Sequence, residues 1–147
     1  MTHENIIEDR QGIKALIEKT HRIAVLGIKT ERQANQPAFF VPRYLADAGF
    51  DIVPVPVYYP EVKEILGRPV YRRLVDIPGP LDLVEVFRRP QDIPPHVPDI
   101  IEKHPTAVWF QLGIRNDGAA EELAEAGILV VQDHCLMVEH RRLGLAA

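Results

Sequence analysis

The stretch Ile23-Ala24-Val25-Leu26-Gly27-Ile28-Lys29-Thr30 is an apolar run that ends in one glycine and passes into a polar loop. A helix is predicted to open near Pro37, because proline favours the first helical position. A buried strand, a glycine loop and a helix N-terminus form the usual phosphate-binding arrangement of nucleotide-binding α/β proteins. The stretch therefore predicts an α/β fold with a ligand-binding loop after its first strand.

The loop lacks most glycines of a dinucleotide fingerprint, because Lys29 and residues 31–36 occupy the positions that G-x-G-x-x-G would require. NAD-binding domains also place Asp or Glu near the end of the second strand to bind the ribose hydroxyls. Here that strand ends in Pro54-Val55-Pro56-Val57-Tyr58, with no acid before Glu61. An apolar edge stiffened by proline suits an adenine or a pantetheine arm better than a ribose diol.

Strand-like and helix-like segments alternate along the whole chain. Apolar runs predict strands at residues 22–28, 51–56, 81–87, 107–112 and 128–131, and helical spacing predicts helices at 5–19, 37–48, 98–103 and 116–126. Prolines and glycines interrupt residues 57–80, which predicts a loop with one short helix around 71–75. The alternation predicts a Rossmann-like, doubly wound sheet of about five parallel strands with helices on both faces.

The bulk properties narrow the class of protein. A chain of 147 residues with 46% hydrophobic composition predicts one domain, with an N-terminal helix at about 5–19 and a core at 22–143. A net charge of -4 without a basic run argues against nucleic-acid binding. Cys135 is the only cysteine, which favours a reducing compartment. Because no signal-like or membrane-spanning apolar stretch is present, we expect a cytoplasmic protein that does not enter a membrane.

Polar residues follow several of the predicted strands, at the edge where open parallel sheets bind ligands. After the first strand, Gly27 permits a close backbone approach, Lys29 offers a charge, and Thr30 offers a hydroxyl and an amide. Arg88 and Arg89 follow the third strand and Arg115 follows the fourth, and arginines there suit phosphate oxygens. Each arginine has the alternative of pairing with a nearby acid or capping a helix.

Two catalytic or metal-binding interpretations concern the C-terminal segment. Asp133-His134-Cys135 with Glu139-His140 collects ligand types that zinc prefers, and either histidine is a candidate base for a thiol nucleophile. A single cysteine followed by an apolar stretch at 136–138, which reads as a packing turn, favours a buried structural thiol. We therefore expect no metal and no catalytic residue. The other histidines, at positions 3, 21, 96 and 104, are expected to be exposed.

Several ordered blocks resemble the small stand-alone CoA-binding proteins, which are similar to the N-terminal CoA-binding domain of the succinyl-CoA synthetase α subunit. The blocks span about residues 22–143 and lie at 23–27, 36–45, 64–67, 82–89, 108–113 and 133–143. The resemblance implies a Rossmann-like fold that holds coenzyme A or an acyl-CoA across the strand ends, with the glycine loop at the diphosphate. It implies no catalytic residue.

Taken with the resemblance, the strand ends define a set of expected CoA-binding residues. The set comprises Gly27, Ile28, Lys29, Thr30, Ala38, Phe39, Val55, Pro56, Phe87, Arg88, Arg89, Gln111, Leu112 and Gly113. Family members commonly show Val-Asn-Pro where this chain has Val55-Pro56-Val57. Two alternatives use the same fold: an NAD(P)-binding oxidoreductase or redox-sensing module, and a CoA-gated module that meets a protein partner.

Overall fold

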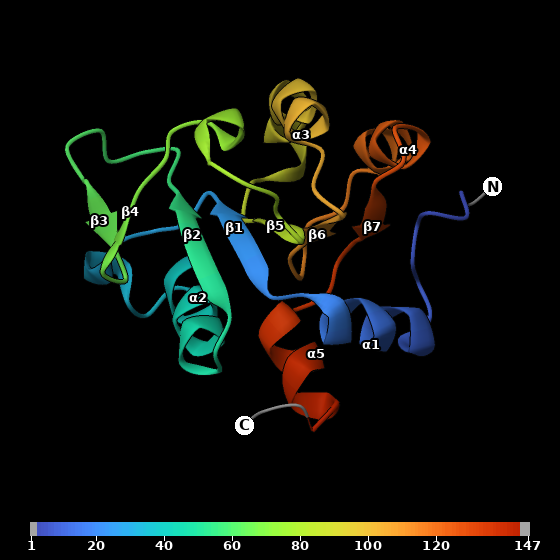
Figure 1. Ribbon diagram of the computed structural model, residues 1–147, viewed down its shortest axis with the longest axis horizontal. Helices are drawn as coiled ribbons and strands as arrows, with labels where there is room; N and C mark the ends of the chain where they lie inside the picture. The colour runs from blue at the N-terminus through green and yellow to red at the C-terminus, as the bar shows by residue number, and fades with distance from the viewer. Residues whose placement is uncertain (1–2, 145–147) are drawn as a thin grey trace.

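The computed structural model describes residues 3–144, and its centre is a five-stranded parallel sheet in the order β2-β1-β5-β6-β7 (Figure 1). Every pair of neighbouring strands in this sheet is parallel. The strands are β1 (Arg22–Leu26), β2 (Asp51–Val55), β5 (Leu83–Val86), β6 (Ala107–Phe110) and β7 (Leu129–Val131). The prediction of about five parallel strands is confirmed.

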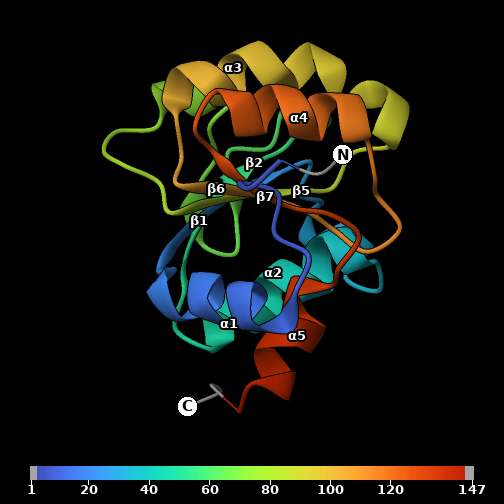
Figure 2. The same cartoon turned by 90° about the vertical axis from the view of Figure 1, so that its right-hand side faces the viewer.

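Helices cover both faces of the sheet, as predicted (Figure 2). One face carries α3 (Val97–Lys103) and α4 (Asp117–Glu125), and the other carries α1 (Arg10–Lys19), α2 (Pro37–Asp47) and α5 (Leu136–Arg142). Successive residues of β1 supply the two cores in turn: Ala24 and Leu26 face α3 and α4, whereas Ile23 and Val25 face the other helices. Burial on both faces explains why this strand is continuously apolar.

The N-terminal helix begins at Arg10, so the prediction that it begins near residue 5 is wrong. Asp9 is its N-cap, and the carboxylate accepts a hydrogen bond from the Gly12 amide at 3.0 Å. The preceding residues run beside β7: the Ile7 amide donates to the Val130 carbonyl at 2.8 Å, and the Val130 amide donates to the Asn5 carbonyl at 2.9 Å. Free backbone groups on β7 therefore compete successfully with the helical spacing of the first isoleucines.

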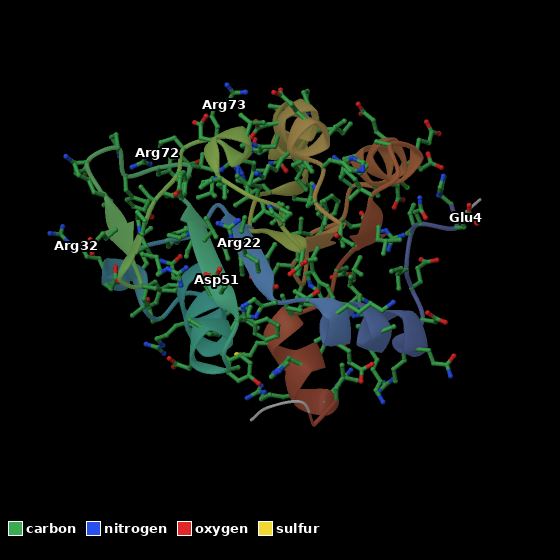
Figure 3. All side chains as sticks on the ribbon, in the orientation of Figure 1. Glu4, Arg22, Arg32, Asp51, Arg72 and Arg73 are labelled. Atoms are coloured by element: carbon green, nitrogen blue, oxygen red, sulfur yellow. The ribbon has the colours of Figure 1, made fainter. Side chains whose placement is uncertain are left out.

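The connection between β2 and β5 contains a small antiparallel hairpin, β3 (Glu64–Ile65) and β4 (Arg68–Pro69), which the sequence did not predict. The short helix expected around 71–75 is a 3-10 turn, η2 (Leu74–Asp76). Arg72 holds this connection together, because its guanidinium donates to the carbonyls of Tyr58, Tyr59 and Val62 at 2.8 to 3.0 Å. Figure 3 labels Arg72 beside this segment.

The apolar stretch at 136–138 is the start of helix α5, so its prediction as a packing turn is wrong. Leu136 is buried against the sheet and Cys135, at the N-cap, is half-buried. The Trp109 indole donates to the His134 carbonyl at 2.8 Å and fixes the chain just before the helix. None of the helices within residues 3–144 is both long and apolar enough to cross a bilayer.

Candidate functional site

The strand order reverses between β1 and β5, whose adjoining carboxyl ends we call the crevice. The chain leaves β1 through α2 to reach β2 on one side, and then crosses to β5 on the other side. Open α/β sheets bind their ligands at such a reversal of strand order. The residues at this point are Gly27, which follows β1, and Phe87, which follows β5.

Gly27 is required by the protein's own backbone. Its φ is +90°, and a Cβ at this position would lie 2.3 Å from the Phe87 carbonyl oxygen. The Gly27 amide donates to the Val55 carbonyl at 2.9 Å, and the Phe87 amide donates to the Leu26 carbonyl at 2.8 Å. Gly27, which the sequence assigned to a ligand, therefore allows the chain to pack closely where β1 and β5 end.

The loop after Gly27 is organised by its own side chains. Thr30 is the N-cap of the 3-10 turn η1 (Glu31–Gln33): its hydroxyl accepts from the Arg32 amide at 3.3 Å, and its amide donates to the Gln33 side chain at 3.1 Å. Both groups predicted to contact a ligand are thus engaged inside the loop. The Lys29 ammonium bonds to Gln36, which leaves two of its three donors.

Half of the expected ligand residues are buried by the protein itself: Ile28, Thr30, Ala38, Phe39, Val55, Pro56 and Gln111. Ala38 and Phe39 lie in the first turn of α2, and Phe39 packs in the core that faces this helix. A ligand can therefore meet most of these residues only through their backbone.

The remaining expected residues reach the surface along the carboxyl edge. At the exit of β6, Leu112 is 65% exposed, and the Gly113 amide, at φ +84°, donates to the Asp133 carboxylate at 2.6 Å. At the exit of β2, Tyr58 is 59% exposed. Asp133 and Tyr58 were not among the expected site residues, although each lies within three residues of a strand end.

Arg88 is a cation at the exit of β5, and its side chain is only 15% exposed. Its Nε donates to His96 Nε2 at 3.2 Å, a terminal nitrogen lies 3.4 Å from the Tyr58 hydroxyl, and the guanidinium lies 5.6 Å from the centre of that ring. The nearest acid, Asp92, is 4.0 Å away. The charge of Arg88 is therefore held mainly by neutral partners.

The other two arginines predicted for phosphate are surface ion pairs. Arg89 is 72% exposed and its Nε bonds to Asp92 at 2.9 Å, while Arg115 bonds to Asp117 at 3.1 Å. Exposed pairs of this kind are worth little energetically, and each acid already satisfies its arginine. The alternative of pairing with a nearby acid therefore holds for these two residues.

His96 is half-buried and touches Arg88, so its prediction as an exposed side chain is wrong. Burial, followed by the charge of Arg88, lowers the pKa of His96, and Asp99 and Asp92 oppose that shift. His3 is also half-buried, and its Nδ1 accepts from the Asn5 amide at 3.0 Å. His21 and His104 are exposed, as predicted.

Glu85 is a fully buried carboxyl in β5, between Val25 of β1 and Trp109 of β6. Neither of its oxygens has a hydrogen-bond partner among the residues that the structure describes. Burial raises the pKa of Glu85 to about 8, so the group holds its proton at neutral pH. A single acid in an otherwise apolar strand was the sequence signal for this feature.

The C-terminal ligand types are drawn into separate pairs. His134 Nδ1 lies 3.4 Å from Glu139, and His140 Nδ1 lies 2.8 Å from the Tyr44 hydroxyl. Between residues 3 and 144, no group of three or more His, Cys, Asp or Glu side chains is placed to hold a metal ion.

Hollows lie at both ends of the sheet. One of about 440 Å³ adjoins the loop after β1, between η1 and residues 59–64, and three glutamates and one arginine line it. A second, of about 470 Å³, lies at the amino end beside Phe50 and His140. The excess of acids in the first hollow repels phosphate, so a phosphorylated ligand is favoured at the Arg88 side of the crevice instead.

Comparison with known proteins assigns the family. Residues 21–141 match the family described as CoA binding domain, and the chain belongs to that family. It is 34% identical over 128 residues to the uncharacterized protein YneT of Bacillus subtilis, which covers 87% of this chain and 91% of YneT. The resemblance found in the sequence blocks is confirmed, and membership supports CoA-related binding in general.

Solved structures agree on the fold. The structure of cell-free ID.343 from Thermus thermophilus has a TM-score of 0.84 and 38% identity, covering 92% of this chain and 99% of that one. The dinucleotide forming acetyl-coenzyme A synthetase 1 of Ca. Korarchaeum cryptofilum has a TM-score of 0.62 and 18% identity over 74% of this chain and 25% of its own. The second likeness concerns the fold alone.

Proposed function

We propose that this chain, as one cytoplasmic domain, binds coenzyme A or an acyl-CoA in the crevice between β1 and β5. The observation that carries the proposal is Arg88, a mostly buried cation at the point where strand order reverses, whose shorter contacts are with the neutral groups of His96 and Tyr58. Tyr58 and Leu112 flank the same edge with exposed apolar surface. Membership in the CoA binding domain family supports the ligand class.

We assign each part of the ligand to a part of the crevice. The phosphates suit Arg88 and the free donors of Lys29, because both cations lie at the exits of neighbouring strands. The adenine or the pantetheine arm suits the exposed rings and methyls of Tyr58 and Leu112. The proline-rich exit of β2 offers no carboxylate to a ribose diol, which disfavours NAD.

Isothermal titration with CoA, dephospho-CoA, NAD, NADP and ATP tests the proposal. We expect heat with CoA and weaker or absent binding of NAD. Saturating CoA should also raise the unfolding temperature, because a ligand at about 100 times its dissociation constant adds about 2.7 kcal/mol to the stability of a one-site protein. Clear binding of NAD with no heat from CoA would overturn the proposal.

A further inference from the structure

We propose that His96 is a positioning residue: its imidazole holds the Arg88 guanidinium in the orientation that receives a ligand phosphate. This inference rests on the proposed function, because it assigns the phosphate to Arg88. His96 itself need not touch the ligand, and nothing in its residue type marks it as part of a CoA site.

Prolines and a backbone hydrogen bond constrain the chain around His96, so the imidazole has a defined place. His96 ends the 3-10 turn η4 (Pro94–His96), which follows η3 (Pro90–Asp92) after one residue. Its amide donates to the Ile93 carbonyl at 2.8 Å, and Ile93 is fully buried. Prolines fix φ at the start of both turns. The ring therefore approaches Arg88 from a fixed support.

The direction of the hydrogen bond fixes the state of the imidazole. Arginine keeps its proton in proteins, so Arg88 Nε is the donor and His96 Nε2 is the acceptor at 3.2 Å. An imidazole that accepts at Nε2 is neutral and carries its proton on Nδ1. The charged groups that face His96 are Arg88, Asp92 and Asp99. Burial and the charge of Arg88 both lower the pKa of His96, which favours the neutral imidazole.

A neutral acceptor orients the guanidinium without cancelling its charge. Arg89 and Arg115 each give Nε to a carboxylate, at 2.9 and 3.1 Å, and so have a negative partner already. Arg88 gives Nε to His96, and its terminal nitrogens have only longer contacts, 3.4 Å to the Tyr58 hydroxyl and 4.0 Å to Asp92. Those terminal nitrogens form the fork that pairs with phosphate oxygens.

The matched variants are His96→Gln and His96→Glu, which have nearly the same shape and differ in charge. A Gln amide oxygen reaches the position of Nε2 and accepts the same hydrogen bond. We expect His96→Gln to bind CoA within about twofold of wild type, and His96→Ala to bind roughly fivefold more weakly. We expect His96→Glu to lose roughly tenfold or more, because its carboxylate neutralises Arg88 although the hydrogen bond is stronger.

A double-mutant cycle separates a positioning role from a general structural one. In an Arg88→Ala background, His96→Ala should cause no further loss of CoA affinity. His21→Ala, an exposed histidine at the opposite end of the sheet, serves as the control and should match wild type. In the ligand-free protein, the Arg88 Nε–H should give a proton NMR signal protected from exchange in wild type and His96→Gln, but not in His96→Ala.

The outcomes distinguish the two proposals. If the wild type binds no CoA, the proposed function fails and this inference fails with it. If the wild type binds CoA, and His96→Ala and His96→Glu bind it as tightly as the wild type, only the role of His96 is overturned. Equal losses from His96→Ala with and without Arg88, or an unprotected Arg88 Nε–H in wild type, would overturn it as well.

Discussion

The two ends of the same sheet use their charges differently. At the amino end, Arg22 pairs with Asp51 at 3.5 Å and donates to the carbonyls of Pro78 and Pro80, and the backbone amide of Arg22 donates to Asp82 at 2.8 Å. Figure 3 shows Arg22 and Asp51 side by side. At the carboxyl end, Arg88 has mainly neutral partners. Charges at the amino end tie loops to the sheet, whereas the charge at the carboxyl end stays available.

Gly27→Ala is expected to have the largest effect on the carboxyl end. The new Cβ would collide with the Phe87 carbonyl and would also strain the backbone at φ +90°. We expect a loss of about 4 kcal/mol in the free energy of unfolding, measured with urea. Gly49→Ala is the matched control, since Gly49 also has positive φ but nothing within 4 Å, and it should cost about 1 kcal/mol. Equal losses of stability in the two variants would show that the close approach of Gly27 to Phe87 does not affect the free energy of unfolding.

Glu85 gives the next largest effect, as a dependence of stability on pH. Its pKa is about 8 in the folded protein against an ordinary 4.5, so the folded state binds the extra proton between these values. The contribution of Glu85 to the free energy of unfolding is therefore fully present below pH 4.5 and falls as pH rises, by about 3 kcal/mol between pH 5 and pH 7.5. Glu85→Gln should remove this slope in urea unfolding, whereas the exposed Glu121→Gln should keep it. A wild-type slope unchanged in Glu85→Gln would contradict the assignment.

Replacing one arginine at each end of the sheet tests the comparison of the two ends most directly. Arg88→Ala should weaken CoA binding by tenfold or more, about 1.4 kcal/mol, because a phosphate partner is removed. Arg22→Ala should leave CoA binding unchanged and lower the unfolding temperature, since it removes a tie between loop and sheet. Titration calorimetry and thermal unfolding on both variants measure the two effects. Weaker CoA binding in Arg22→Ala together with unchanged binding in Arg88→Ala would contradict a binding site at the carboxyl end.

Tyr58 is expected to give the smallest effect. Tyr58→Ala removes the exposed ring that lies against Arg88, and we expect CoA binding to weaken roughly threefold. Tyr58→Phe keeps the ring and should bind within experimental error of wild type. Comparable losses in both variants would assign the effect to the hydroxyl, which lies 3.4 Å from Arg88.

The fold was largely predictable because its strands are buried on both faces and its helices carry terminal signals. Pro37 opens α2 and Gly49, at φ +103°, follows its end, as the sequence indicated. The start of α1 was not predictable from spacing, because Asn5 and Ile7 are held by hydrogen bonds with Val130, more than a hundred residues away in the chain. Local periodicity cannot report a contact of that range.

The candidate site was predictable in position but not in detail. Arg88 could be named because it directly follows an apolar strand. The bond between Arg88 and His96 depends on two consecutive 3-10 turns that bring a histidine back over the arginine, and no spacing rule describes that path. The contact of Gly27 with Phe87 was not predictable, because these residues lie far apart in the sequence, and the ligand role of Gly27 stays a prediction.

The pairing of the N-terminal segment with β7 also limits strand pairing between copies of the chain. An uncovered edge strand offers a row of free amides and carbonyls to another chain, and the segment at Asn5 to Ile7 takes up part of that row. At the opposite edge, Pro54 in β2 has no amide to donate, and its carbonyl accepts from Tyr71. Both margins of the sheet therefore offer fewer free backbone groups to the strand of another chain, which disfavours growth into fibrils.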